Sequence, residues 1–323
     1  MNTNIIEVSN LSKYFGDFQA VRDVTFSIEP GEVFAFLGPN GAGKTTTINM
    51  LTGLAKPSSG SINIAGYNGI RDIKSVQHMI GIVPDESNLY EDLSGHDNLV
   101  FCASLYGMRK NDRESRAKKL LDQFGLADTG KRPFKAYSKG MKRKLTIAAG
   151  IIHSPEILFL DEPTTGIDVE SARQIRRLVT DLNGNGTTIF LTTHYIEEAE
   201  RLCSRVGFIV DGKVVRIDSI KNLMKEEEKE YIIEFTLEEH DPSLNEAMIR
   251  AFPGIMINRT DNRKIRVIPK EKTALAPFIK FFEDSHKPVY EAKIIHPTLE
   301  DVFVKITGIE ITKMKKEKEG KKI

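Results

Sequence analysis

The sequence has little cysteine and no long apolar run, and each absence excludes a class of protein. Its two cysteines, Cys102 and Cys203, give neither a disulfide framework nor a zinc-binding spacing, which favours a reducing, cytoplasmic setting. The start of the chain lacks the charged segment and apolar block of a signal peptide. Apolar runs such as residues 33–37 fall far short of the roughly 20 residues in a membrane-spanning helix. We therefore expect no direct membrane span.

The chain also lacks an excess of either charge. It has 46 Lys and Arg residues against 45 Asp and Glu residues, a net charge of +1 over 323 residues. Domains that bind duplex nucleic acid usually carry a large positive excess, so we expect no nucleic-acid partner. Hydrophobic residues at 40% and charged residues at 28% are typical of a globular protein, here with about two domains.

Residues 1–222 alternate apolar strand patterns with helical ones, which predicts an α/β domain with a largely parallel sheet. Strands are expected at 32–37, 80–83, 156–160, 188–192 and 206–210. Antiparallel hairpin strands before Pro30 and after Arg205 are expected at the edge of this sheet. Few strand signals occur within about residues 85–154, which we interpret as a helical subdomain inserted between strands.

Residues 223–308 have a different pattern. Strands at 231–237, 255–258, 264–268 and 289–295 alternate with helices at 244–252 and 273–284, and a last helix is expected at 299–306. This βαββαβ order predicts a small ferredoxin-like α+β domain. It carries no catalytic constellation, so we interpret it as an accessory or dimerisation domain. Residues 309–323 form a Lys-rich tail, either solvated or in contact with anionic lipid head groups.

A phosphate-binding loop follows the predicted strand at 32–37. Backbone N–H groups of such a loop surround a β-phosphate at the start of a helix, whose dipole favours negative charge. Lys44 is expected to reach the β- and γ-phosphates, and the Thr45 hydroxyl to bind Mg²⁺. The expected nucleotide-binding residues here are Gly38, Pro39, Asn40, Gly41, Ala42, Gly43, Lys44, Thr45 and Thr46. The pattern predicts a nucleoside triphosphatase without deciding its class.

Two adjacent acids end the predicted strand at 156–160. Asp161 is expected to hold Mg²⁺ through water, and Glu162 to act as the general base that polarises the attacking water. A strand that merely ends on a polar turn is the plain alternative, which the upstream phosphate loop disfavours.

The surrounding segments resemble the ATP-binding subunits of ATP-binding-cassette (ABC) transporters over about the first 220 residues. Residues 137–145 resemble the signature motif of that family, with Ser138 and Gly140 at matching positions, and residues 163–168 resemble its dimer-contact loop. Residues 191–194 resemble the switch-histidine segment, which places His194 on the γ-phosphate. The resemblance also places Phe15 against adenine and implies ATP with Mg²⁺ as cofactors.

At three positions of these motifs, the sequence differs from the family pattern. Asp85 stands where a glutamine usually contacts Mg²⁺ and links the site to the membrane partner; an aspartate is shorter, so contact through water is expected. Lys139 and Met141 replace the glycine and glutamine of the signature motif. Lys139 either assists the nucleotide of the partner or points into solvent.

With the C-terminal segment, these departures resemble the ABC-2-type exporter branch, which includes drug, sodium, polysaccharide and peptide-resistance pumps. The resemblance implies a head-to-tail dimer of two nucleotide-binding subunits, a homodimer by expectation, that drives a separate transmembrane permease from the cytoplasmic face of the membrane. An importer ATPase with the same chemistry is an alternative that the sequence leaves open. The alternative from another class is a non-transport ABC ATPase acting on ribosomes or DNA.

Overall fold

The computed structural model describes residues 4–227, 232–238, 242–259, 263–271, 273–295 and 298–309. Contacts divide the described chain into two compact units, one of residues 4–220 with 303–309 and the other of residues 221–302. Within these described residues, no helix combines the length and apolar character needed to cross a bilayer. Each unit is described by itself.

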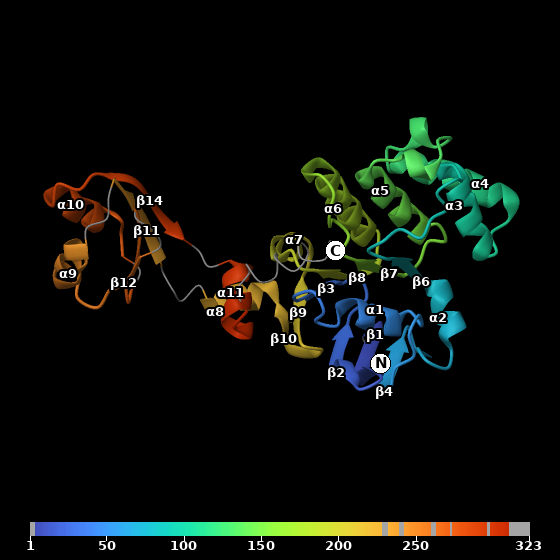
Figure 1. Cartoon of the computed structure of the whole chain (residues 1–323), viewed down its shortest axis with the longest axis horizontal. Helices are drawn as coiled ribbons and strands as arrows, with labels where there is room; N and C mark the ends of the chain where they lie inside the picture. The colour runs from blue at the N-terminus through green and yellow to red at the C-terminus, as the bar shows by residue number, and fades with distance from the viewer. Residues whose placement is uncertain are drawn as a thin grey trace. The chain divides into compact units, whose positions relative to one another are not determined.

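A six-stranded sheet forms the centre of the first unit, in the order β10-β9-β3-β8-β7-β6 (Figure 1). The inner strands are parallel, and the residues of β3, β7 and β8 are buried throughout because both faces of the sheet are covered. The bounds are β3 Val33–Leu37, β6 Ile80–Val83, β7 Ile157–Asp161, β8 Thr188–Thr193, β9 Arg205–Val210 and β10 Lys213–Ser219. The five predicted strands are confirmed within one residue at each end, and only β10 runs antiparallel to its neighbour.

A second, antiparallel sheet has the order β2-β1-β4-β5. Its strands are β1 Ile6–Phe15, β2 Phe18–Ile28, β4 Ser59–Ile64 and β5 Tyr67–Asn68. The hairpin before Pro30 joins this separate sheet by pairing with β4, and its strand β2 contacts β10 at the edge of the six-stranded sheet, where the hairpin was expected. The alternating burial of β1 and β2 explains this, because one face of each strand turns to the core.

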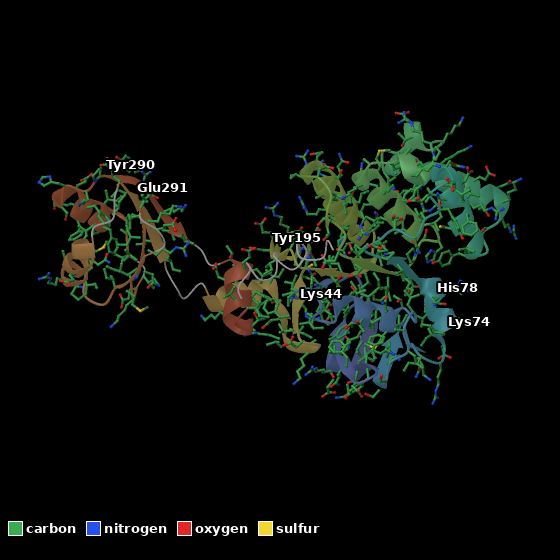
Figure 2. All side chains as sticks on the ribbon, in the orientation of Figure 1. Lys44, Lys74, His78, Tyr195, Tyr290 and Glu291 are labelled. Carbon is green, nitrogen blue, oxygen red and sulfur yellow. The ribbon has the colours of Figure 1, made fainter. Side chains whose placement is uncertain are left out.

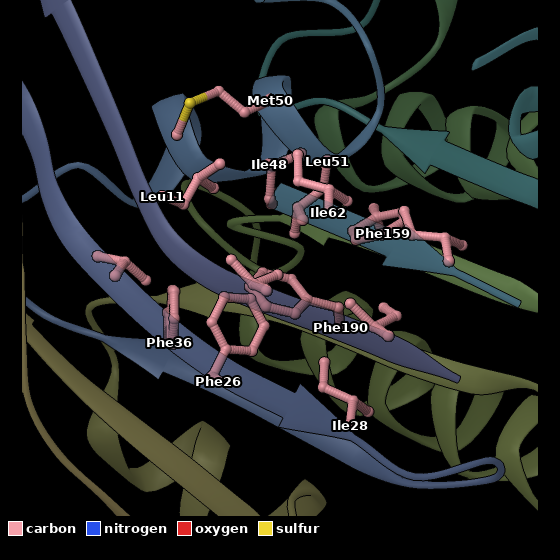
Figure 3. Packing of buried hydrophobic residues seen from close by; sticks show 14 of the residues in the cluster. Leu11, Phe26, Ile28, Phe36, Ile48, Met50, Leu51, Ile62, Phe159 and Phe190 are labelled. Carbon is pink, nitrogen blue, oxygen red and sulfur yellow. The ribbon is translucent and has the colours of Figure 1, made fainter. Parts of the chain in front are cut away.

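The two sheets share one apolar core with helix α1, Lys44–Leu51. The rings of Phe26, Phe34, Phe36 and Phe190 pack within 6 Å of one another, in edge-on, tilted and stacked arrangements. Figure 3 shows this packing together with side chains of α1. Burying a ring of this size contributes about 2–3 kcal/mol. The start of α1, where the phosphate loop ends, is thus fixed against the sheets.

Helices fill the segment between β6 and β7: α3 Gly95–Leu105, α4 Lys110–Gln123 and α5 Lys139–Gly150, with short 3-10 turns Ala127–Thr129 and Phe134–Ala136. They gather into one group, drawn in green in Figure 1. The other helices of this unit are α2 Ile73–Met79, α6 Val169–Gly184 and α7 Ile196–Leu202. The helices expected between strands are present, while the subdomain limits of about 85–154 stay a prediction.

The second unit contains a four-stranded antiparallel sheet in the order β12-β13-β11-β14. Its elements are β11 Ile232–Leu237, α9 Pro242–Ala251, β12 Met256–Arg259, β13 Lys264–Ile268, α10 Ala276–Asp284 and β14 Val289–Ile295. One face of the sheet packs with α9 and α10 around Phe235, Phe278 and Phe282. This is the predicted ferredoxin-like βαββαβ arrangement.

Two helices, α8 Ile220–Glu227 and α11 Leu299–Thr307, lie where the units divide. Phe303 of α11 packs edge-on against Phe208 of β9, with ring centroids 5.3 Å apart, so this part of α11 belongs with the first unit. The limits 1–222 and 223–308 stay predictions. The Lys-rich tail at 309–323 lies outside the described residues except for Ile309.

Candidate functional site

The phosphate loop joins β3 to α1 and depends on two glycines that leave no room for a side chain. A Cβ on Gly38 would lie 2.1 Å from the Ile209 carbonyl oxygen, and one on Gly43 would lie 2.7 Å from that of Ala20. Gly43 also precedes α1 at φ 99°, a conformation that other residues rarely adopt. The loop therefore presents its backbone N–H groups at the start of a helix, where an anion is favoured.

Lys44, labelled in Figure 2, is the first residue of α1. Its Nζ donates to the carbonyl oxygens of Gly38 at 2.7 Å and Pro39 at 3.1 Å, and lies 3.4 Å from Oε1 of Glu162. The side chain is only 6% exposed. A buried ammonium at the centre of the loop supplies a positive charge where phosphate oxygens would lie.

Hard oxygen atoms meet beside the loop. The Thr45 hydroxyl donates to Oδ2 of Asp161 at 2.8 Å, and the Thr192 hydroxyl donates to Oδ1 of the same carboxylate. A hydroxyl beside a carboxylate fits Mg²⁺, which prefers oxygen ligands and keeps several waters and phosphate oxygens. No cluster of three or more His, Cys, Asp or Glu side chains within the described ranges forms a metal site alone. These residues thus fit a magnesium ion that is shared with a nucleotide.

Glu162 follows β7 in a left-handed conformation, φ 50°, which turns its side chain toward Lys44 and His194. Its Oε2 lies 2.8 Å from Nδ1 of His194 and accepts a hydrogen bond from the Thr165 hydroxyl at 2.9 Å. Burial raises the pKa of Glu162, but the hydrogen bond from His194 and the charge of Lys44 outweigh it and leave the pKa below its ordinary value. The carboxylate is therefore ionised at neutral pH, as a general base requires.

A cavity of about 310 Å³ connects these groups to the tip of the β1–β2 hairpin. Phe15 and Phe18 are register partners across that tip, are 54% and 63% exposed, and both line the cavity. The Nζ of Lys13 lies 4.9 Å from the ring centroid of Phe15. Predicted residues that also line it are Asn40, Gly41, Ala42, Gly43, Lys44, Thr45, Thr46, Asp85 and Glu162. Aromatic faces at one end and cations and carboxylates at the other suit a nucleotide.

Comparison with known proteins decides the family. The ABC transporter family model matches residues 21–165. The chain is 33% identical to the linearmycin resistance ATP-binding protein LnrL of Bacillus subtilis (strain 168), over 94% of this chain and 98% of the relative. It is also 33% identical to the daunorubicin resistance ATP-binding protein DrrA3 of Streptomyces coeruleorubidus, over 95% and 97%. The chain belongs to the ABC transporter family.

Solved structures agree with this assignment. The structure of an ATP-binding subunit of an ABC transporter is 30% identical, with a TM-score of 0.63, over 69% of this chain and 92% of the other. A dimeric, post-hydrolysis ATP-binding cassette bound to ADP and Pi is 27% identical, with a TM-score of 0.62, over 67% and 98%. The chain is therefore an ABC ATPase, an ATP-binding and ATP-hydrolysing transporter subunit. The alternative that acts on ribosomes or DNA has no support from these relatives.

The signature residues of this ABC ATPase do not line the nucleotide cavity of their own chain. Ser138 caps α5, and its Oγ accepts a hydrogen bond from the Met141 N–H at 3.2 Å. A Cβ on Gly140 would lie 2.1 Å from the Ser171 Oγ, so this glycine lets α5 approach the start of α6. Asp168, the last acid of the expected dimer-contact loop, caps α6 there.

Four residues of the site were missed by the sequence analysis. Thr192 binds Asp161, Thr165 binds Glu162, Phe18 lines the cavity, and Arg143 donates to several carbonyls of the site. Phe18 had a readable signal, because an aromatic residue across a tight hairpin turn from Phe15 must share its face. Thr192 and Arg143 had none, because Asp161 lies 31 and 18 residues away from them in the sequence, whereas Thr165 stands only three residues after Glu162, within the segment 163–168. The roles expected for the predicted site residues stay predictions.

Proposed function

We propose that two copies of this chain close head to tail over two Mg²⁺-bound ATP molecules and that closure drives a separate transmembrane permease. The observation that carries the proposal is the incompleteness of the site. The phosphate loop, Lys44 and Glu162 line one cavity, whereas Ser138 and Gly140 do not line it. A second copy is the natural source of a signature motif for this cavity, since one chain contains the motif once.

Within the closed dimer, the residues have separate tasks. Lys44 and the backbone of the loop bind the β- and γ-phosphates, Thr45 and Asp161 hold Mg²⁺ with Asp85 near it through water, and Phe15 stacks on adenine with Phe18 beside it. Bound Mg²⁺ neutralises charge on the phosphates. Ser138 and Gly140 of the partner copy cover the γ-phosphate.

Glu162 accepts a proton from the attacking water, and His194 holds the γ-phosphate. Since Nδ1 of His194 faces the Glu162 carboxylate, Nε2 is the ring nitrogen that is left to face the phosphate. Loss of the γ-phosphate removes the bridge between subunits and reopens the dimer.

The direction of transport is proposed to be export, with the dimer on the cytoplasmic face of the membrane. The names of LnrL and DrrA3, both resistance ATP-binding proteins matched along nearly their whole length, support this. The departures at Asp85, Lys139 and Met141 point the same way. The C-terminal unit of residues 223–308 is proposed to assist dimer contact.

Mixing two inactive variants tests the shared site. Lys44→Ala chains and Ser138→Ala chains are each expected to hydrolyse ATP at a small fraction of the wild-type rate. In the mixed dimer, one of the two sites has both an intact loop and an intact signature motif, so each mixed dimer should have up to about half of the wild-type activity, and a random 1:1 mixture should recover about a quarter. No recovery, or wild-type turnover by a monomer independent of protein concentration, contradicts the head-to-tail model.

A further inference from the structure

Arg143 of α5 reaches the ends of two neighbouring strands with one side chain. Its Nη2 donates to the Asp161 carbonyl at 2.6 Å and its Nε to that of Pro163 at 2.9 Å. Its Nη1 donates to the Asp85 carbonyl at 3.1 Å and also to that of Pro84. Only 7% of this side chain is exposed. The guanidinium thus donates to backbone carbonyls at the ends of both β6 and β7.

Arg143 bridges the two chain segments that follow the last paired residues of β6 and β7. β6 and β7 pair in parallel up to Val83 and Leu160, after which each chain leaves the sheet as a loop. The first loop contains Asp85 and the second contains Glu162. A planar guanidinium has five N–H donors in a fixed arrangement, so it sets the spacing of both loops at once.

Nearby carboxylates stabilise the positive charge of the buried Arg143 side chain. Burial lowers the pKa of its side chain, and the carboxylates of Asp85 and Asp161 act against that effect. Replacing the guanidinium by a neutral side chain leaves up to four buried carbonyls with fewer donors, and a buried carbonyl without a donor destabilises the folded loops. A lysine keeps the charge but presents a compact point with no planar fork.

We propose that Arg143 is a positioning residue that fixes Asp161, Glu162 and the Asp85 loop to the signature helix α5 of the same subunit. Its position allows this, because α5 starts at Ser138, the residue expected to meet the nucleotide of the partner copy. Movement of that helix on closure is passed through the guanidinium to the magnesium ligand and the base. This inference rests on the proposed roles of Asp161 and Glu162.

The chain offers a matched control in Arg116 of α4. Its Nε donates to the Ile152 carbonyl at 3.2 Å and its Nη2 to that of Ile151 at 3.2 Å, at the C-terminal end of the same helix α5. Arg116→Gln therefore removes the same kind of arginine–carbonyl bonds from α5. It does so without touching the strand ends at Asp85 and Asp161.

The experiment compares Arg143→Gln, Arg143→Lys and Arg116→Gln in the full chain. We expect Arg143→Gln to lower kcat at least tenfold and to raise the Mg²⁺ concentration for half-maximal rate, while the Kd for ATP changes less than about threefold. Arg143→Lys should recover only part of the rate, and it carries the same test if the glutamine variant does not fold. Arg116→Gln should lower Tm with kcat and Mg²⁺ dependence near wild type. Equal losses of kcat in both glutamine variants, scaling with Tm, would overturn the proposal.

Mixed dimers locate the effect within one subunit. In a dimer with one Lys44→Ala chain, the working site uses the loop and carboxylates of the other chain. Arg143→Gln placed in that other chain should remove most of the remaining activity, and placed in the Lys44→Ala chain it should remove less. The reverse order would show that Arg143 supports only the signature motif, and sink the inference. Full turnover by Glu162→Gln would instead refute the proposed function, whatever Arg143 does.

Discussion

The carboxylate of Glu162 lies 2.8 Å from Nδ1 of His194, and both residues follow directly on neighbouring parallel strands, β7 and β8. Both side chains are almost fully buried, so the contact is poorly screened by water. Lys44 approaches the same carboxylate from the phosphate loop. The residues proposed as base, phosphate-facing histidine and phosphate-binding lysine therefore meet at the Glu162 carboxylate.

Glu162→Gln should keep ATP binding and lose at least about 100-fold in kcat, because an amide cannot accept the proton of the attacking water. ATP should then hold the chain as a dimer, since the bridging γ-phosphate persists. Light scattering after gel filtration with and without ATP measures this, together with phosphate release. Near-normal phosphate release would contradict the role of Glu162 as the base.

Thr165→Val should lower kcat several-fold with little change in the Kd for ATP. The valine has nearly the same shape but no hydroxyl to donate to Oε2 of Glu162, and a hydrogen bond to a charged group is worth about 1.5–3 kcal/mol. Thr165→Ser, which keeps the hydroxyl, is the matched control and should stay near the wild-type rate. A valine variant as fast as the serine variant would show that this bond does not hold the base in place.

The acid side of the pH–rate profile should report on the same carboxylate. The pKa of Glu162 is lowered in the folded chain from the value of 4.5, so its ionised form persists, and its stabilising contacts are kept, at neutral pH. These contacts are fully present above the unfolded pKa and are lost as pH falls through the folded pKa. Removing the Thr165 hydroxyl should raise this pKa, so the acid limb of single-turnover rates should move to higher pH. If the acid limb of the pH–rate profile stays in place, the Thr165 hydroxyl does not influence the pKa of Glu162.

Phe18→Ala should weaken ATP binding and reduce the preference for ATP over CTP. A purine spans two rings, and the pair Phe15 and Phe18 offers a wider apolar face than either ring alone; stacking on an aromatic ring is worth about 1–3 kcal/mol per base. Tyr67→Ala is the control, because this exposed aromatic residue lies on β5 and does not line the cavity. Equal Kd values for the wild type and Phe18→Ala would leave Phe15 as the only platform.

Much of the fold was readable from periodicity. The buried parallel strands are continuous apolar runs, and both the loop at 38–45 and the acids at 161–162 follow such runs. The ferredoxin-like unit was readable because its strands alternate and its helices repeat with the helical period. The sheet that the hairpin β1–β2 joins could not be predicted, because the sequence of two strands that pair with each other does not indicate which other strands they pair with.

The sequence by itself determined where Lys44, Asp161 and Glu162 lie in the local structure, because spacing places Lys44 at the start of the helix after one buried strand and the two acids at the carboxyl end of another. Only the tertiary structure decided which side chains meet there. The contacts of Thr192 and Arg143 with Asp161 depend on how loops leave neighbouring strands, and those paths follow from packing across the whole unit. Contacts between residues far apart in sequence leave no local pattern to read.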